Sequence, residues 1–204
     1  MLAKDNIFDH IYYEIHEYLV SFKFITQNKF LDAFLIDPNN IEKSYYLQSI
    51  TNSIWTAHFV HMRSLIDFFS NIKNPNVDDD IILETILIPT VISPCLLDKK
   101  TDLDYMDKSG KKIFYGSKSE TLRYTNIINK SIQHLSTKRA IYDDLKTSVP
   151  MEDLQRQTIT NMYDILHPRI KAFINLLSNP ANLCAEYQND YNDYDKLFNA
   201  LIGD

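Results

Sequence analysis

Glycine is scarce in this chain, and its scarcity narrows the choice of folds more than any other feature of the sequence. The 204 residues include only three glycines, Gly110, Gly116 and Gly203. β-Sandwiches and doubly wound α/β folds normally need many more glycines for their turns. Nucleotide-binding loops of the Rossmann or P-loop kind need clustered glycines, because their backbone N–H groups must approach the phosphates closely. The sequence therefore argues against these classes and favours helices.

Apolar residues recur at three- and four-residue spacings along four long stretches of the chain, which is typical of amphipathic helices that bury one face. We expect helices over about 7–35, 40–72 and 119–134. A fourth helix should begin after Pro150, and Pro168 should kink or split it. The predicted fold class is all-α, an up-down helical bundle of about four principal helices.

The length of the chain fits one large domain, and we expect a single helical-bundle domain over residues 1–177. Prolines, glycines and charges in residues 88–118 indicate a long irregular insertion. The segment just before it, IILETILI at 81–88, could be a short helix or a buried strand, because periodicity alone does not distinguish them. Residues 178–204 are rich in Asn, Asp and Tyr, and we expect a loosely held polar tail or a short helix there.

Composition and charge also indicate the cellular compartment and argue against some classes of partner. Two cysteines, Cys95 and Cys184, are too few for a disulfide scaffold, so we expect a reducing, cytoplasmic compartment. We expect no signal peptide and no membrane span, since every apolar stretch falls short of the ~20 residues that a span requires. A net charge of −6 disfavours non-specific binding to duplex nucleic acid. No cofactor is expected.

A first polar cluster, His58, His61, Arg63 and Asp67, lies within the second predicted helix. At 100° per residue, His58 and His61 share the apolar stripe of that helix, so both should face the core. A buried imidazole needs a partner, because an unsatisfied buried polar group costs ~1–3 kcal/mol. The pair could be core histidines satisfied by their neighbours, or it could line a polar site or a metal site. Arg63 and Asp67, four residues apart, could form an ion pair on the helix surface.

A second cluster occupies residues 123–139, the most basic segment of this acidic chain. His134 lies one helical turn after Lys130, so both should project from one face of the predicted helix. Arg123 shares that face but sits ~16 Å away by helical rise, so one phosphate cannot be gripped by all three side chains of one chain. Arg139 follows at the helix end, where cations also interact favourably with the helix dipole.

Two short segments carry a resemblance to known proteins. They are HMRSLIDFF at 61–69 and NKSIQHLSTKR at 129–139. Together they resemble a group of small bacterial helical proteins and, more distantly, the HEPN superfamily, over about residues 40–176. This resemblance implies a helical bundle that often dimerises. It also implies an RNA-cutting site near one helix end, where an Arg, a polar residue and a His assist attack of a ribose 2′-hydroxyl on the neighbouring phosphate.

Carried over to this sequence, the resemblance assigns the general acid/base role to His134 and the orienting role to Asn129. The positions where the family pattern has its arginine are Ile127, Ile128 and Asn129, so that arginine has no counterpart here. Lys130 and Arg139 are the remaining candidates for the phosphate-binding cation. The candidate catalytic set is therefore His134, Asn129, Lys130 and Arg139.

Three hypotheses of function follow. The first is an RNA-directed protein, a metal-independent endoribonuclease of a toxin or phage-defence system, which would act as a homodimer. The second is a non-catalytic helical module that binds a cognate protein partner or itself, with both motifs serving as polar core connections. The third is a metal-dependent enzyme that uses His58 and His61, with oxygen ligands from Asp78, Asp79 and Asp80.

Overall fold

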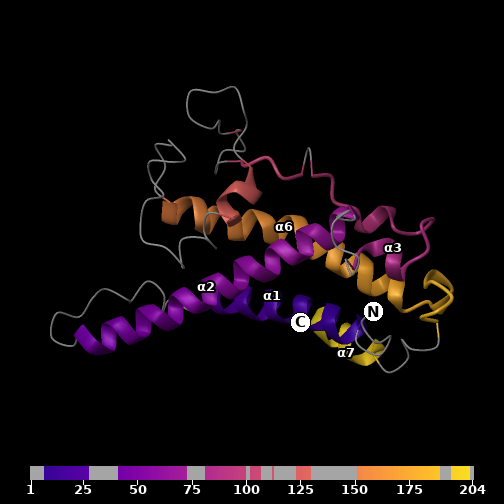
Figure 1. Cartoon of the computed structure of the whole chain (residues 1–204), viewed down its shortest axis with the longest axis horizontal. Coiled ribbons are helices and arrows are strands. Elements are labelled where there is room, and N and C mark those ends of the chain that lie inside the picture. Colours follow the sequence, from indigo (N-terminus) through magenta and orange to yellow (C-terminus); the bar gives the residue numbers. More distant parts are fainter. Residues whose placement is uncertain are drawn as a thin grey trace. The chain divides into compact units, whose positions relative to one another are not determined.

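The computed structural model describes residues 7–27, 41–72, 81–99, 102–106, 112, 123–129, 151–188 and 194–202. Within these residues the chain is helical, and its only β pairing consists of isolated bridges. The elements, drawn in Figure 1, are α1 (Ile7–Gln27), α2 (Ile41–Ser70), α3 (Leu83–Ile86), the 3₁₀ turn η3 (Ser93–Cys95), α6 (Met151–Leu177), the 3₁₀ turn η4 (Pro180–Asn182) and α7 (Asp195–Ile202). The predicted all-α class is confirmed. No helix in the described ranges is long and apolar enough to cross a membrane.

The chain divides into two compact units. Unit 1 comprises Met1–His16, Arg63–Leu103 and Asn161–Asp204, and unit 2 comprises Glu17–Met62 and Asp104–Thr160. The boundaries fall inside α1, α2 and α6, so each of these helices supplies residues to both units. The division into a domain over 1–177 and a tail stays a prediction.

The predicted helices agree with the observed ones where the structure describes them. Helix α2 matches the expected span of 40–72 closely, and residues 124–129 form part of the third predicted helix. The expected extension of the first helix to Leu35 lies outside the described residues, as does the rest of the third. Pro168 does not split the fourth helix, since α6 runs unbroken through it, and the alternative of a kink stays a prediction. Leu166 and Ile170, which flank Pro168, are fully buried, and this packing offsets the hydrogen bond that proline removes.

Aromatic side chains form the core of unit 1. Phe68 and Phe69 at the end of α2 meet Phe173 of α6 edge to face, with ring centroids 5.2 and 6.1 Å from that of Phe173. Phe198 of α7 lies 6.4 Å from the Phe173 ring and is fully buried. Such edge-to-face pairs place the positive ring edge over the negative face. Helix α7 is therefore packed into the core rather than loosely held.

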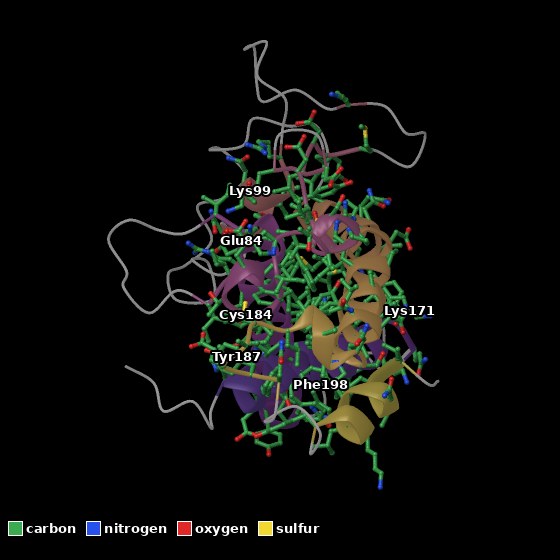
Figure 2. All side chains as sticks on the ribbon, turned by 90° about the vertical axis from the view of Figure 1, so that its right-hand side faces the viewer. Glu84, Lys99, Lys171, Cys184, Tyr187 and Phe198 are labelled. Atoms are coloured by element: carbon green, nitrogen blue, oxygen red, sulfur yellow. The ribbon has the colours of Figure 1, made fainter. Side chains whose placement is uncertain are left out.

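The C-terminal segment before α7 is also fixed to unit 1. Its Tyr187, labelled in Figure 2 with Phe198, is buried and packs edge-on against Phe8 of α1. Cys184 donates a backbone hydrogen bond to the carbonyl of Ile86, and Leu183 forms an isolated bridge with Leu87. Aromatic burial thus gives this polar-looking stretch the apolar contacts that a tail lacks.

The insertion is irregular in its described part, 88–99 and 102–106, as predicted. It contains one 3₁₀ turn and is held by buried side chains, among them Cys95, Leu97 and Leu103. The backbone N–H of Leu97 donates to the carbonyl of Phe69, 2.8 Å away, at the end of α2. The ambiguous 81–88 segment is a single helical turn, α3, followed by extended backbone at Leu87.

One asparagine ends α2 and fixes α3. Asn71 has a φ of 52°, in the left-handed region that Asn tolerates better than residues with bulkier side chains. Its amide nitrogen donates to Oε1 of Glu84 at 2.8 Å, while its amide oxygen accepts from the backbone N–H of Glu84 at 3.0 Å. The reciprocal pair holds the first turn of α3 against the end of α2.

We expect Asn71→Gly and Asn71→Leu to separate the two contributions of this residue. Both variants lose the hydrogen bonds to Glu84, but only leucine also meets the steric cost of the left-handed conformation, about 1–2 kcal/mol. Chemical unfolding should therefore give a free energy of unfolding that is lower for Asn71→Leu than for Asn71→Gly by about 1 kcal/mol. Equal stabilities for the two variants would contradict this account of the turn.

Candidate functional site

The two histidines of the first cluster are buried, as their place on the apolar stripe predicts. His58 has no exposed surface and His61 is 8 % exposed. Both lie on the part of α2 that belongs to unit 2, where Phe59 and Met62 are also fully buried. Tyr18 and Ser21 of α1, which lie on the apolar stripe of that helix in the same unit, contact His58.

His58 is held on two sides. Its Nδ1 atom lies 2.8 Å from the hydroxyl oxygen of Ser21, and its ring stacks on that of Tyr18, with centroids 5.0 Å apart and planes inclined by 13°. The Ser21 hydroxyl donates back to the main chain of α1, where the carbonyls of Glu17 and Tyr18 lie 2.5 and 3.1 Å away. Its single proton is thereby used, so Ser21 accepts from His58. The geometry assigns the proton to Nδ1 and the lone pair to Nε2.

The imidazole of His58 is kept neutral. Its pKa is lowered from 6.5 to about 3, chiefly by burial and also by the neighbouring His61, while a hydrogen bond with the Tyr18 backbone raises it only partly. Its Nε2 atom is buried and has no hydrogen-bond partner among the residues that the structure describes. A base this weak is almost fully deprotonated at neutral pH but has little tendency to take a proton from a substrate, because a general base works best with a pKa near the working pH.

The other residues of the first cluster point elsewhere. Arg63 and Asp67 are on the exposed side of α2 in unit 1. Asp67 accepts from the ammonium of Lys99 in the irregular segment, at 2.8 Å, and this is its ion pair in the described part of unit 1. With Asp67 exposed and Lys99 partly exposed, such a surface pair adds little stability. The structure therefore separates the buried histidines from the surface charges that follow them in sequence.

The described residues include no group of three or more His, Cys, Asp or Glu side chains arranged to hold a metal ion. The oxygen ligands that the metal hypothesis needs, Asp78, Asp79 and Asp80, lie outside those residues. A metal site at His58 and His61 stays a prediction.

Of the predicted catalytic set in the second cluster, Asn129 alone falls within the described residues. It is partly exposed, on a helical stretch whose Tyr124, Ile127 and Ile128 are buried. The remaining members of the predicted catalytic set, Lys130, His134 and Arg139, lie outside the described residues. Whether the four side chains come together stays a prediction.

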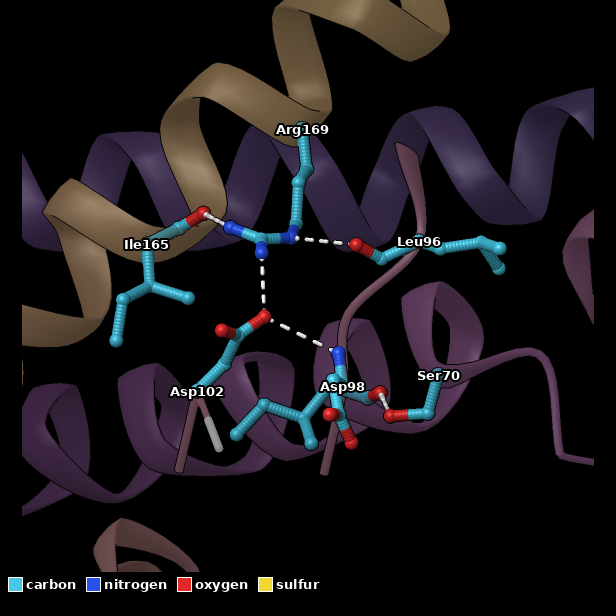
Figure 3. A network of polar contacts seen from close by, with 7 residues as sticks. Ser70, Leu96, Asp98, Asp102, Ile165 and Arg169 are labelled. Atoms are coloured by element: carbon cyan, nitrogen blue, oxygen red, sulfur yellow. Dashed lines mark hydrogen bonds and ion pairs between the residues drawn. The ribbon is translucent and has the colours of Figure 1, made fainter. Parts of the chain in front are cut away.

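A third polar cluster, in unit 1, does not follow from any sequence motif. Figure 3 shows the guanidinium of Arg169 on α6 donating to the carbonyl of Leu96 at 3.0 Å, to that of Ile165 and to the carboxylate of Asp102. The same carboxylate oxygen accepts from the backbone N–H of Asp98 at 3.1 Å. Each nitrogen of the guanidinium donates one hydrogen bond, so this network anchors the irregular segment to α6.

Sequence reasoning missed Ser21 and the pair Arg169–Asp102. Ser21 had a detectable signal, since a serine one turn after Tyr18 interrupts the apolar stripe of α1 where only a core position is expected. The Arg169 network had none, because its partners Leu96 and Asp102 lie more than 60 residues away in a segment without periodicity.

No protein family matches this chain, and no curated protein or solved structure matches it either.

The buried His58 should make unit 2 less stable in mild acid. Because its folded pKa, about 3, is below the unfolded value of 6.5, the unfolded chain binds the proton first. Stability is then complete above pH 6.5 and falls as the pH drops toward 3, by up to about 1.4 kcal/mol per pH unit. We expect His58→Asn, which keeps a nitrogen donor for Ser21 but does not titrate, to have a shallower loss.

Urea unfolding of both proteins between pH 7 and 5 measures this difference. Burial also lowers the pKa of His167, but this residue is present in both proteins and cancels in the comparison. Parallel pH profiles for the two proteins would show that His58 is not buried in its neutral form.

Proposed function

We propose that this chain is a non-catalytic helical interaction module, in which unit 2 presents the outer side of α2 to a macromolecular partner. The observation that carries the proposal is a row of exposed, uncharged side chains. Tyr46, Ile50 and Val60 are 67, 40 and 41 % exposed, and they lie on the same side of the helix as Ser53 and Ala57. We call these five residues the uncharged face.

Charge is missing from this part of the chain to an unusual degree. Residues 44–62 contain no Asp, Glu, Lys or Arg, although the chain as a whole is 24 % charged, and 19 residues of average composition would hold about five. Exposed helix surfaces in soluble proteins are usually charged, whereas interface cores are depleted of charge and enriched in Tyr. A helix face that contacts only solvent is not expected to lack charged residues in this way.

The buried side of the same helix supports a structural role. His58 is neutral, desolvated and engaged by Ser21, so it connects α1 to α2 within unit 2 rather than offering a proton to a substrate. A helix fixed in this way presents its outer residues in a constant arrangement, which lowers the entropic cost of binding. Free Cys95 and Cys184 are compatible with the reducing, cytoplasmic compartment that belongs to this proposal.

A photo-reactive phenylalanine analogue at position 50 should test the interaction role directly. We expect irradiation of the full chain in cells to give a covalent adduct of higher mass, because a bound partner would lie within reach of that side chain. The same analogue at Thr26 on α1, which is exposed and back-bonded to Phe22, is the matched control and should give none. Absence of any adduct at position 50 would overturn the proposal.

A second function, RNA cleavage, is proposed on the second cluster. The observation in its favour is the partial exposure of Asn129, which leads directly into the basic stretch that contains Lys130 and Arg139. His134 would take the proton of a ribose 2′-hydroxyl as its oxygen attacks the adjacent phosphorus. The bond from phosphorus to the 5′-oxygen would break, that oxygen would receive a proton, and a 2′,3′-cyclic phosphate would remain, while the cations balance the phosphate charge. This metal-independent chemistry would be that of a toxin or phage-defence ribonuclease, in which an imidazole supplies the base.

The variant His134→Ala is expected to abolish RNA cleavage, or growth inhibition in cells, while the melting temperature stays within a few degrees. His10→Ala, at an exposed histidine of α1, is the control and should retain activity. Cleavage should persist in the presence of a chelator. Wild-type protein that leaves single-stranded RNA intact under these conditions would rule out this second function and leave the interaction role untouched.

A further inference from the structure

We propose that the partner of the uncharged face is a second copy of this chain, with the two α2 helices packed antiparallel about Ser53. The inference rests on the interaction role proposed above and names its partner. The residues that carry it are Tyr46, Ile50, Ser53, Ala57 and Val60, all in unit 2.

The spacing of the uncharged face is that of a helix seam. Its members are separated by four, three, four and three residues, the alternation that keeps one stripe of a helix facing a neighbouring helix over successive turns. At 100° per residue all five lie within an arc of about 80°. A stripe this narrow fits the side of a second helix better than it fits an extended peptide or a broad curved surface, which would need a wider face.

The sizes of the side chains favour the antiparallel arrangement. With Ser53 on the two-fold axis, Tyr46 lies opposite Val60 of the second copy, and Ile50 lies next to Ala57, offset by one residue or ~1.5 Å along the helix. Large residues thus meet smaller ones, so the layers interdigitate. In a parallel pair each residue would meet its own copy, which places two tyrosines together at one end and two alanines with a gap between them near the other. The axis at Ser53 also lets the backbones approach closely.

The absence of charge on the uncharged face explains why two copies of this face can contact each other without repulsion. Each chain carries a net charge of −6, so most of its surfaces repel a copy of themselves at close range. The face between residues 44 and 62 does not, because it contains no ionised group. A foreign partner is usually selected by complementary charge, and this face offers none. Self-complementary shape without charge matches the symmetric pairing expected of homodimers.

The contact is small, and this sets its strength. From Tyr46 to Val60 the helix rises ~21 Å, and only three large apolar side chains are exposed along it. A standard interface buries about 800 Å² per partner, which this stripe alone does not reach. We therefore expect a reversible dimer with a dissociation constant on the order of micromolar or weaker.

Two valines of similar exposure provide a matched test. Val60 is 41 % exposed on the uncharged face, whereas Val20, 47 % exposed on α1, lies within a turn of the charged Glu17 and Lys23. In sedimentation velocity over a range of concentrations, the wild-type full-length chain should shift from monomer to dimer. Val60→Lys should weaken this association at least tenfold, because two lysines would enter an uncharged contact, and Val20→Lys should leave it unchanged. A wild-type monomer at all concentrations, or equal effects of the two variants, would overturn the inference.

Disulfide trapping tests the arrangement and does not depend on how Val60→Lys folds. In a Cys184→Ser background, which leaves only the buried Cys95, Ser53→Cys should form a covalent dimer on mild oxidation. Ile50→Cys alone should not, but a mixture of Ile50→Cys with Ala57→Cys should. Efficient trapping of Ile50→Cys with itself would indicate a parallel pair and overturn the antiparallel arrangement.

The adduct at position 50 then separates this inference from the broader proposal. An adduct between two copies of the chain supports both. A foreign adduct together with a sedimentation monomer overturns the dimer and leaves the interaction role standing. A cross-link to another part of the same chain shows that the face is covered internally and overturns both.

Discussion

Removal of the His58 imidazole from water is the constraint on which unit 2 depends. A buried apolar face can slide along its neighbour at modest cost, but a buried polar atom must meet its partner or lose about 1–3 kcal/mol. The bond from Nδ1 to the Ser21 hydroxyl, 2.8 Å long, therefore ties the register of α1 to that of α2. Moving either helix by one residue would rotate its side chain by 100° and break the bond. The stacked Tyr18 ring restricts the imidazole further.

The same desolvation makes His58 a structural residue of α2 rather than a catalytic base. An imidazole that binds its proton only near pH 3 is a core residue with a polar edge, and its fully buried ring has no exposed surface for a substrate to touch. On another side of α2 in unit 2, Tyr46, Ile50 and Val60 are exposed. The helix thus has one face fixed by a hydrogen bond and another that is uncharged, and the fixed face holds the uncharged one in a constant position.

The sequence predicted what depends on periodicity and little that depends on long-range contacts. Glycine scarcity and apolar stripes sufficed for the all-α class, for the span of α2 and for the burial of His58 and His61, because each follows from local spacing. The partner Ser21 lies on another helix, so the sequence around His58 does not predict it. Of the kink or split expected at Pro168, the split does not occur, because the core packing of α6 keeps the helix continuous. The short helix that the sequence allowed within 178–204 is α7, but the polar composition gave no sign that its Phe198 would be buried.

Association between copies of an acidic chain requires a balance between attraction at the contact and repulsion between the two bodies. Repulsion between net charges of −6 acts at a distance and is screened over about 8 Å in physiological salt, so it slows encounter more than it weakens a formed contact. Charges inside the contact would act at a few ångströms and could not be screened. Their exclusion from residues 44–62 removes this unscreened part. A modest apolar stripe can then hold two copies together where a charged helix of equal area could not.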